Sequence, residues 1–281
     1  MKKEELLKKY SEIIQMRKYS IETGKCYLYH LLKFFDFKTN VYPYNLSSQD
    51  INDYLVHLNS KNVSDSYFNQ AINAIKFFFK YVLNRKIKDY MVVRPKRAKT
   101  QPIILDKTEI QKMFDVCTNL KHKTILSLLY STGIRCSEVI NLKIKDIDSK
   151  LMVIRIISGK GRKSRMVTLD TNVLEMLRKY YLEYKPIEYL FNGQNSLQYS
   201  KKSIEEVVKK LGVKCGINKR VYPHLFRHNY ITDSLENGID LRVIKESVGH
   251  SSIKTTEAYT HISPKMIANI KSPIQGINLD I

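Results

Sequence analysis

Four short runs after residue 130 of this 281-residue chain combine side chains that suit chemistry on an anionic substrate. In chain order they read GIRCSE, SGKGRKS, PHLFRH and GHSSIKTTEAYTH. Their candidate reactive residues are Arg135, Glu138, Lys160, His224, Arg227, His250 and Tyr259. Guanidinium groups stay charged and fork onto anionic oxygens. Lysine and histidine transfer protons, and a tyrosine oxygen can act as a nucleophile.

Each run taken alone has an ordinary structural explanation. An arginine and a glutamate three residues apart, as at Arg135 and Glu138, commonly support a helix surface. The GKG around Lys160 is often only a hairpin turn. A histidine after a glycine, such as His250, is more often a cap or packing residue, and Tyr259 on a short helix is more often half buried. The combination and order of the runs therefore carry the functional interpretation.

The elements that must position these residues are mostly helical, with one small sheet. Asp106 and Glu109 form a capping-box pattern that predicts a helix start, and the apolar helix over residues 121–142 is interrupted at Gly133. LMVIRII and RMVTLD predict two strands joined by the SGKGRKS turn, and KIKDID could add a third. The remainder is predicted to be helical, with breaks at Gly212, Gly216, Gly238 and Gly249.

The first part of the chain predicts a helical bundle. Segments 19–37, 46–61 and 63–84 carry apolar residues at helical spacing. Candidate N-caps are Ser47 or Ser48 for the second segment and Ser64 for the third. The aromatic residues near its end are expected to pack in the core; they are Phe77, Phe78, Phe79 and Tyr81.

The composition changes at residues 85–102, where the segment RKIKDYMVVRPKRAKTQP is basic and contains two prolines. Pro95 and Pro102 push the preceding residues toward an extended conformation. We expect a helical N-terminal domain over 1–90, a basic linker over 91–103 and a second domain over 104–281. The predicted fold class is mainly α, with a small three-stranded antiparallel sheet in the α-rich second domain.

The composition is strongly basic, with 48 Lys and Arg against 27 Asp and Glu and a formal net charge of +21. This surplus, spread over both parts of the chain, favours a nucleic acid as partner and an anionic membrane surface second. A basic protein with neither partner is the remaining alternative. No apolar run is long enough to span a membrane, the start lacks a signal-peptide apolar region, and the four cysteines have no CxxC spacing. We expect reduced cysteines and a cytoplasmic protein.

The four runs, in this order and with these flanking residues, resemble the catalytic domain of the tyrosine recombinases, or phage-type integrases. The similarity extends from about Asp106 to Ile262 and includes STGIRCSEVINLKIKDID, SGKGRKSRMVTL, PHLFRHNYITDSLENGIDLRVIKESVGH and KTTEAYTHIS. The N-terminal part resembles the family's core-binding domain by position, length and helical texture. The resemblance is to the simpler, Xer-like kind with two domains.

The resemblance implies a specific reaction. In this family a tyrosine oxygen attacks a DNA phosphodiester and forms a 3′-phosphotyrosyl link with a free 5′-hydroxyl. The bond energy stays in this intermediate, so ATP is not needed. The matching nucleophile is Tyr259, the phosphate clamp is Arg135 with Arg227, and the proton donor to the departing 5′-oxygen is Lys160.

The resemblance also assigns the remaining polar residues of the runs. His224 would transfer a proton or bond the phosphate, His250 would support a phosphate oxygen, and Glu138 would hold an active-site cation in place. No metal ion and no cofactor is implied. The residues after Tyr259 would form a tail that docks into a neighbouring subunit.

Double-stranded DNA carrying a specific recombination site is the expected partner. Linker side chains should lie along phosphates, and polar residues on two helices could read bases. The candidate DNA-binding residues are Arg94, Lys96, Arg97, Lys99, Asn69, Gln70, Asn73, Lys201 and Lys202. For any one of the helical residues a solvated face is an equal alternative.

The expected assembly is a tetramer on two DNA sites, built from one protein or from two related ones. Two other functions compete with a site-specific recombinase. A type IB topoisomerase-like enzyme would use similar chemistry on one duplex, and a non-catalytic DNA-binding protein could keep the same scaffold. The tail and the spacing of the runs favour the recombinase, and the complete set of reactive residue types argues against a non-catalytic protein.

Overall fold

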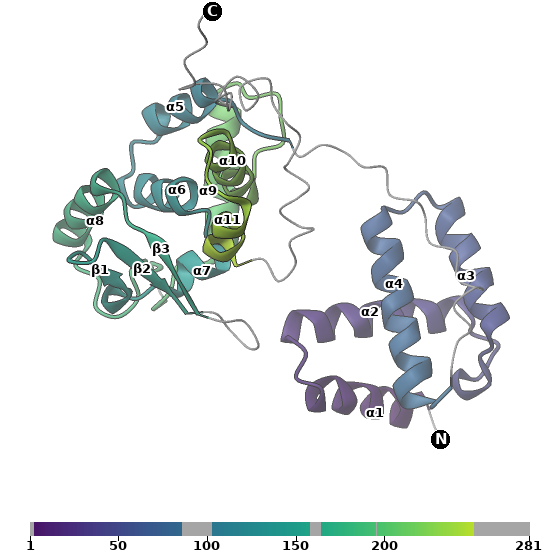
Figure 1. Cartoon of the computed structure of the whole chain (residues 1–281). Helices are drawn as coiled ribbons and strands as arrows, with labels where there is room; N and C mark the ends of the chain where they lie inside the picture. Colours follow the sequence, from purple (N-terminus) through teal and green to yellow (C-terminus); the bar gives the residue numbers. More distant parts are fainter. Residues whose placement is uncertain (1–2, 86–102, 158–163, 195, 250–281) are drawn as a thin grey trace, which may run out of the picture. The chain divides into compact units, whose positions relative to one another are not determined.

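The computed structural model describes residues 3–85, 103–157, 164–194 and 196–249. The chain divides into two compact units, Met1–Lys99 and Thr100–Ile281 (Figure 1). Both are mainly helical in their described parts, and the second holds a three-stranded antiparallel sheet. The predicted fold class is therefore confirmed. The linker predicted over 91–103 lies outside the described residues except at its last position, so the proposed domain boundaries stay predictions.

The described part of the N-terminal unit contains α1 (Lys3–Met16), α2 (Ile21–Phe37), α3 (Ser48–Ser60) and α4 (Asp65–Phe77). A wider helical turn, Phe78–Val82, continues α4. The sequence patterns predicted three of these helices and missed α1. Its buried residues Leu6, Tyr10 and Ile14 recur every four positions, as a helix requires, but they are embedded among charges.

Side-chain caps fix where these helices begin. Ser47 is the N-cap of α3, where its hydroxyl and the Asp50 carboxylate form a reciprocal capping box. Ser64 caps α4 by accepting from the Tyr67 amide, as predicted. Phe77, Phe78 and Phe79 are buried in the core of this unit and Tyr81 is partly buried against it, which confirms the packing interpretation.

The described part of the C-terminal unit begins with α5 (Lys107–Val116), α6 (Leu120–Thr132) and α7 (Cys136–Asn141). The sheet and α8 (Thr171–Tyr184) follow. The last described helices are α9 (Lys201–Lys214), α10 (Pro223–Glu236) and α11 (Leu241–Val248). The predicted capping box of Asp106 and Glu109 starts α5.

The sheet has the order β1 (Ile147–Asp148), β2 (Val153–Ile156), β3 (Arg165–Thr168). Ile154 pairs with Val167, and Ile156 pairs with Arg165 at the end next to the predicted turn. KIKDID is a strand only in its last two residues, because Ile144–Asp146 form a 3₁₀ turn.

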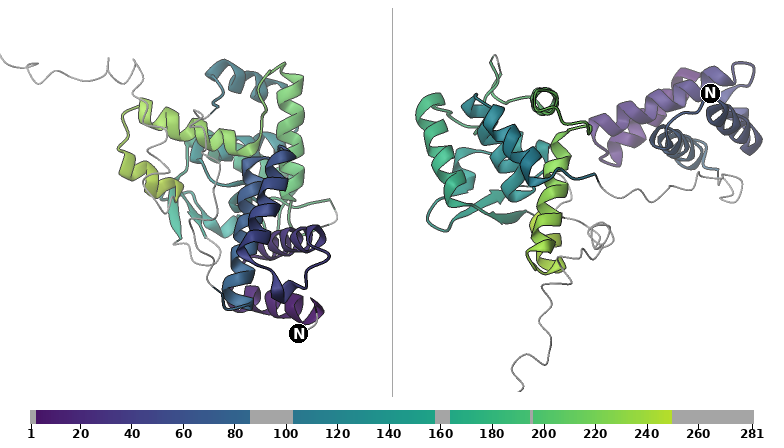
Figure 2. Two further views of the ribbon diagram at one scale, coloured as in Figure 1. Left: turned by 90° about the vertical axis from the view of Figure 1, so that its right-hand side faces the viewer. Right: turned by 90° about the horizontal axis from the view of Figure 1, so that it is seen from above.

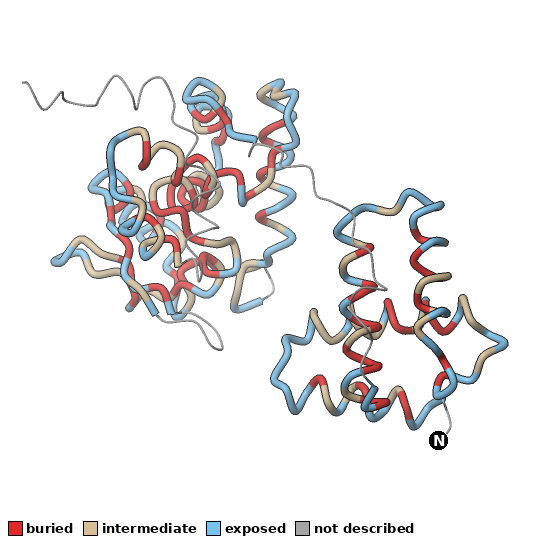
Figure 3. Tube along the Cα trace, turned by 45° about the vertical axis from the view of Figure 1, so that its right-hand side comes forward, coloured by how far each residue is buried: buried red, intermediate tan, exposed pale blue. Residues whose placement is uncertain are grey.

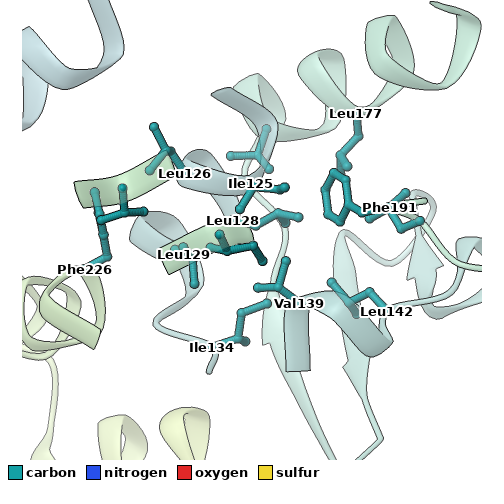
Figure 4. Packing of buried hydrophobic residues seen from close by; sticks show 14 of the residues in the cluster. Ile125, Leu126, Leu128, Leu129, Ile134, Val139, Leu142, Leu177, Phe191 and Phe226 are labelled. Atoms are coloured by element: carbon teal, nitrogen blue, oxygen red, sulfur yellow. The ribbon is translucent and has the colours of Figure 1, made fainter. Parts of the chain in front are cut away.

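The core of this unit surrounds α6, which lies between α8 and α10 (Figures 1 and 2). Phe226 of α10 lies beside Leu126 and Leu129 of α6, while Leu177 of α8 and Phe191 lie on the other side (Figure 4). Burial follows one stripe of most helices, whereas in α6 it covers the continuous run 124–129 and none of its residues is exposed (Figure 3). Full burial of each such side chain stabilises the fold by about 1.5–3 kcal/mol. A packed helix core thus carries the loops and helix ends that bear the site.

Glycines end helices here at four of the five positions predicted to interrupt them. Gly133, Gly216, Gly238 and Gly249 have positive φ, which only glycine adopts readily. The fifth prediction, a break at Gly212, is wrong, because this residue lies inside α9. A Cβ at Gly212 would lie 2.6 Å from Val221 Cγ2, so the missing side chain lets α9 pack closely.

Candidate active site

α10 places His224 and Arg227 one helical turn apart, as the spacing predicted. Pro223 occupies the first turn, where its missing N–H costs no helical hydrogen bond. Arg227 is 1% exposed, although its side chain is charged. Its Nη1 donates to the Gly133 carbonyl (2.7 Å) and its Nη2 to the Val248 carbonyl (2.6 Å). The guanidinium is therefore held between the end of α6 and the end of α11.

Arg135 follows the left-handed turn at Gly133 and is the N-cap of α7. Its backbone N–H donates to Glu138 Oε2 (2.8 Å) and its Nη1 to Glu138 Oε1 (2.9 Å). Its Nη2 donates to the Gly249 carbonyl (2.9 Å). The two arginines predicted as a phosphate clamp thus meet adjacent carbonyls at the end of α11.

Glu138 is a buried carboxylate that serves two arginines. Besides its bonds with Arg135, Glu138 accepts two hydrogen bonds from Arg165, the first residue of β3. Arg165 Nη1 donates to Oε1 and Nη2 donates to Oε2, at 2.9 Å each. Burial raises the pKa of Glu138, but the hydrogen bonds and charges of Arg165 and Arg135 outweigh it and lower the pKa to about 2. Glu138 is ionised at neutral pH and bonds the Arg135 guanidinium, while its predicted role at an active-site cation stays a prediction.

The arrangement concentrates positive charge at one end of α11. Arg135, Arg165 and Arg227 come together there with one carboxylate, Glu138, among the described side chains that they bond. Guanidinium groups in a partly dry site bind anionic oxygens strongly. The site is therefore suited to a phosphate group and to the charge that develops on it in a displacement reaction.

His224 and His228 lie on successive turns of α10 with their ring centroids 4.6 Å apart. Desolvation, followed by the charges of Arg227 and Arg135, lowers the pKa of His224. Desolvation and the neighbouring His224 lower the pKa of His228 to about 4. Both rings are neutral at pH 7, so His224 can donate one hydrogen bond and accept a proton at the other ring nitrogen.

A groove of about 1260 Å³ extends from Arg135 and His224 along α9. Its lining includes two acidic residues, Glu205 and Glu206, and the basic residues Lys201, Lys209, Lys219 and Arg220. Lys201 is exposed and pairs with Glu205 at 3.4 Å. The groove therefore connects Lys201, a predicted DNA contact on α9, with Arg135.

Several predicted residues are not tested by this geometry. Lys160, His250, Tyr259 and the linker residues Arg94, Lys96, Arg97 and Lys99 lie outside the described residues. Asn73 and Lys202 are exposed. Asn69 donates to the Asp65 carbonyl, and Gln70 Oε1 lies within hydrogen-bond distance of both Cys26 and His30. The DNA contacts of these residues stay predictions.

Sequence reasoning missed Arg165. This residue lies in the quoted SGKGRKSRMVTL run, but it is one of 48 basic residues and its carboxylate partner is 27 positions away. No local signal singled it out.

Comparisons with known proteins agree over nearly the whole chain. Residues 104–266 match the phage integrase family, and residues 6–89 match the N-terminal SAM-like domain of phage integrases. A helical unit followed by this sheet-bearing catalytic unit defines a tyrosine-type recombinase. The chain belongs to the phage integrase family, since its match to that family covers more than half of its length.

Relatives and solved structures point the same way. The chain is 34% identical to the putative integrase/recombinase y4qK of Sinorhizobium fredii, over 96% of this chain and 88% of that protein. It is 33% identical to tyrosine recombinase XerA of Pyrococcus horikoshii, over 93% and 90%. The crystal structure of XerH bound to its difH substrate has a TM-score of 0.73 at 21% identity, covering 90% of this chain and 79% of that one. That last likeness concerns the fold.

Two further observations concern the described residues only. None of their helices is long and apolar enough to cross a bilayer. Their His, Cys, Asp and Glu side chains form no group of three or more that could hold a metal ion. Metal-independent chemistry stays a prediction.

Proposed function

We propose that this chain is a site-specific DNA recombinase that cuts and rejoins strands through a 3′-phosphotyrosyl intermediate. The observation that carries the proposal is the convergence of Arg135 and Arg227 on the adjacent carbonyls of Gly249 and Val248. Two guanidinium groups that meet in this way can clamp the non-bridging oxygens of one phosphodiester. His224 stands beside them on α10.

The proposed reaction is a balanced exchange of ester bonds. The Tyr259 oxygen forms a bond to phosphorus and gives its proton to the neutral His224 ring or to solvent, while the bond from phosphorus to the 5′-oxygen breaks. Lys160 gives a proton to the departing 5′-oxygen. His224 accepts or shares a proton at the phosphate, His250 supports a phosphate oxygen, and the reverse reaction joins a different strand.

The relatives support DNA as substrate, since they are named as recombinases and integrases and XerH is bound to a difH substrate. The net charge of +21 suits this partner. We further propose a tetramer on two DNA sites, in which the residues after Tyr259 dock into a neighbouring subunit. These relatives give no support to a topoisomerase or to a non-catalytic protein.

The test is trapping of the covalent intermediate. Protein–DNA adducts mapped across a genome would identify the site, and a synthetic nicked duplex of that site would then trap the adduct in the presence of EDTA and without ATP. We expect an adduct with the wild-type chain and none with Tyr259→Phe. An adduct with the phenylalanine variant would refute the nucleophile assignment. Product DNA with exchanged flanks, rather than relaxation of supercoils alone, separates a recombinase from a topoisomerase.

A further inference from the structure

Arg165 is the third arginine of the site, and no sequence pattern assigned it a role. We propose that Arg165 is a positioning residue for strand cleavage, which fixes Arg135 through Glu138 and fixes the end of α11 against β3. This inference rests on the proposed function and adds a residue to it.

The contacts of Arg165 occupy all three of its guanidinium nitrogens. Nη1 and Nη2 donate to the two oxygens of Glu138 at 2.9 Å, and Nε donates to the Ser247 carbonyl. Its side chain is only 7% exposed. These contacts connect Arg165 to the Glu138 carboxylate and to the end of α11, and Arg165 acts through these two partners.

Three arginines share the last carbonyls of α11 in strict order. Arg165 donates to Ser247, Arg227 to Val248 and Arg135 to Gly249. Cations are favourable at a helix C-terminus, where carbonyls lack helical partners. The order means that a shift of α11 would move all three contacts together, and Arg165 is the one that anchors them to the sheet.

The Arg165 guanidinium lies close to the backbone of Gly249, the residue that ends α11. The residue has φ +65°, and a Cβ built on it would lie 3.2 Å from Arg165 Nη1. Arg165 therefore joins three segments that lead to predicted reactive groups. β3 follows the segment in which a turn carrying Lys160 is predicted, Arg135 is the N-cap of α7, and the end of α11 directly precedes His250 in the sequence.

Lysine cannot replace this arginine. One ammonium group lacks the planar fork that reaches two carboxylate oxygens, and it cannot hold the Ser247 carbonyl at the same time. Misplacement of a reacting group by about 1 Å can slow a reaction about 100-fold. We expect Arg165→Gln to slow cleavage by about 100-fold and Arg165→Lys by at least about 10-fold, with DNA affinity within about threefold of wild type.

The experiment measures single-turnover formation of the covalent adduct on the nicked duplex at saturating protein. The variants are Arg165→Gln, Arg165→Lys and the matched control Arg155→Gln, an exposed arginine of the neighbouring strand that pairs with Asp148. Thermal unfolding shows which variants fold, and Arg165→Lys keeps the charge if Arg165→Gln does not fold. A role in folding alone would reduce the amplitude of adduct formation, whereas a positioning role reduces the rate constant of the folded protein.

Glu138→Gln completes a double-mutant cycle. If Arg165 acts through Glu138, adding Arg165→Gln to Glu138→Gln should slow cleavage much less than it slows the wild type. Full multiplication of the two effects, or a wild-type rate constant for Arg165→Lys, would overturn the inference while leaving the proposed function intact. A wild-type chain that forms no adduct on the mapped site would instead overturn the proposed function itself.

Discussion

At the scale of single residues, Glu138 is a buried carboxylate held by two arginines. Its carboxylate is buried yet ionised because Arg165 and Arg135 surround it. Removing one partner of a buried charge pair leaves the other charge uncompensated, which is costly. The ionised form of Glu138 therefore contributes to stability as well as to the placement of Arg135.

This contribution should depend on pH in a defined direction. The pKa of Glu138 is about 2 in the folded chain against an ordinary 4.5. Because the folded chain lowers this pKa, the ionised carboxylate contributes its full stabilisation above about pH 4.5. As the pH falls toward 2, the free energy of unfolding should lose this contribution of about 3 kcal/mol. Urea unfolding between pH 5 and 2 should show the wild-type advantage over Glu138→Gln shrinking by that amount. An advantage that stays constant over this range would contradict the assignment, and exposed Glu175→Gln on α8 is the control.

The sequence singled out this residue, Arg135 and Arg227 through the order of the four runs and the family resemblance that they carry, and their roles in catalysis stay predictions. It could not identify Arg165, since the contact that matters joins a strand to a helix 27 residues away. It also could not show that the arginines bond to backbone carbonyls of α11. Every residue has such a carbonyl, so the amino-acid types do not indicate which carbonyls accept these bonds.

At the scale of elements, α10 is tied to the segment that precedes α5. Asn229, two residues beyond Arg227, is 2% exposed and bonds the backbone of Leu105 twice. Its Oδ1 accepts the Leu105 N–H at 3.0 Å, and its Nδ2 donates to the Leu105 carbonyl. Lys219 also donates to the neighbouring Ile104 carbonyl. The start of the described catalytic unit is thereby tied to the helix that carries His224 and Arg227.

Asn229→Ala should therefore destabilise the catalytic unit by about 2–4 kcal/mol, because it leaves a buried backbone donor and acceptor of Leu105 unpaired. Denaturant unfolding of the full chain measures this change. The surface variant Asn141→Ala, which also loses a side-chain bond to a backbone carbonyl, is the control and should cost less than about 1 kcal/mol. Equal losses in the free energy of unfolding for the two variants would show that the buried contacts of Asn229 stabilise the unit no more than an exposed hydrogen bond does.

Helix starts and stops were largely predictable, because Ser64, Asp106 and Gly133 act through local backbone chemistry. Gly212 was misinterpreted because its reason is tertiary: Val221 occupies the space that a side chain would fill. α1 was missed because its three core residues lie among charged neighbours. Local rules fix element ends, whereas packing partners distant in sequence decide which residues an element can contain.

At the scale of the whole molecule, two units with separate cores share one excess of positive charge. Such a charge surplus promotes association with DNA by releasing counterions from phosphates, which makes the affinity dependent on salt. Charge composition alone could predict this partner, but it could not say which basic residues touch phosphate, because composition carries no information on where each side chain lies.

The linker residues provide a test of that distinction. We expect the logarithm of the association constant for a duplex to fall linearly with the logarithm of the salt concentration. A variant with glutamine in place of Arg94, Lys96, Arg97 and Lys99 should show a less steep slope. The slope should fall by about 0.9 for each phosphate that is no longer neutralised, up to about 3.6. A control that replaces Arg178 and Lys179, exposed on α8, removes charge away from the proposed contacts and should change the slope by less than about 1. Fluorescence anisotropy between about 50 and 300 mM salt measures both slopes, on the mapped site and on an unrelated duplex. The linker effect should be equal on the two duplexes, since phosphate contacts carry no base information; a weakening confined to the mapped site would mean that these side chains read sequence instead.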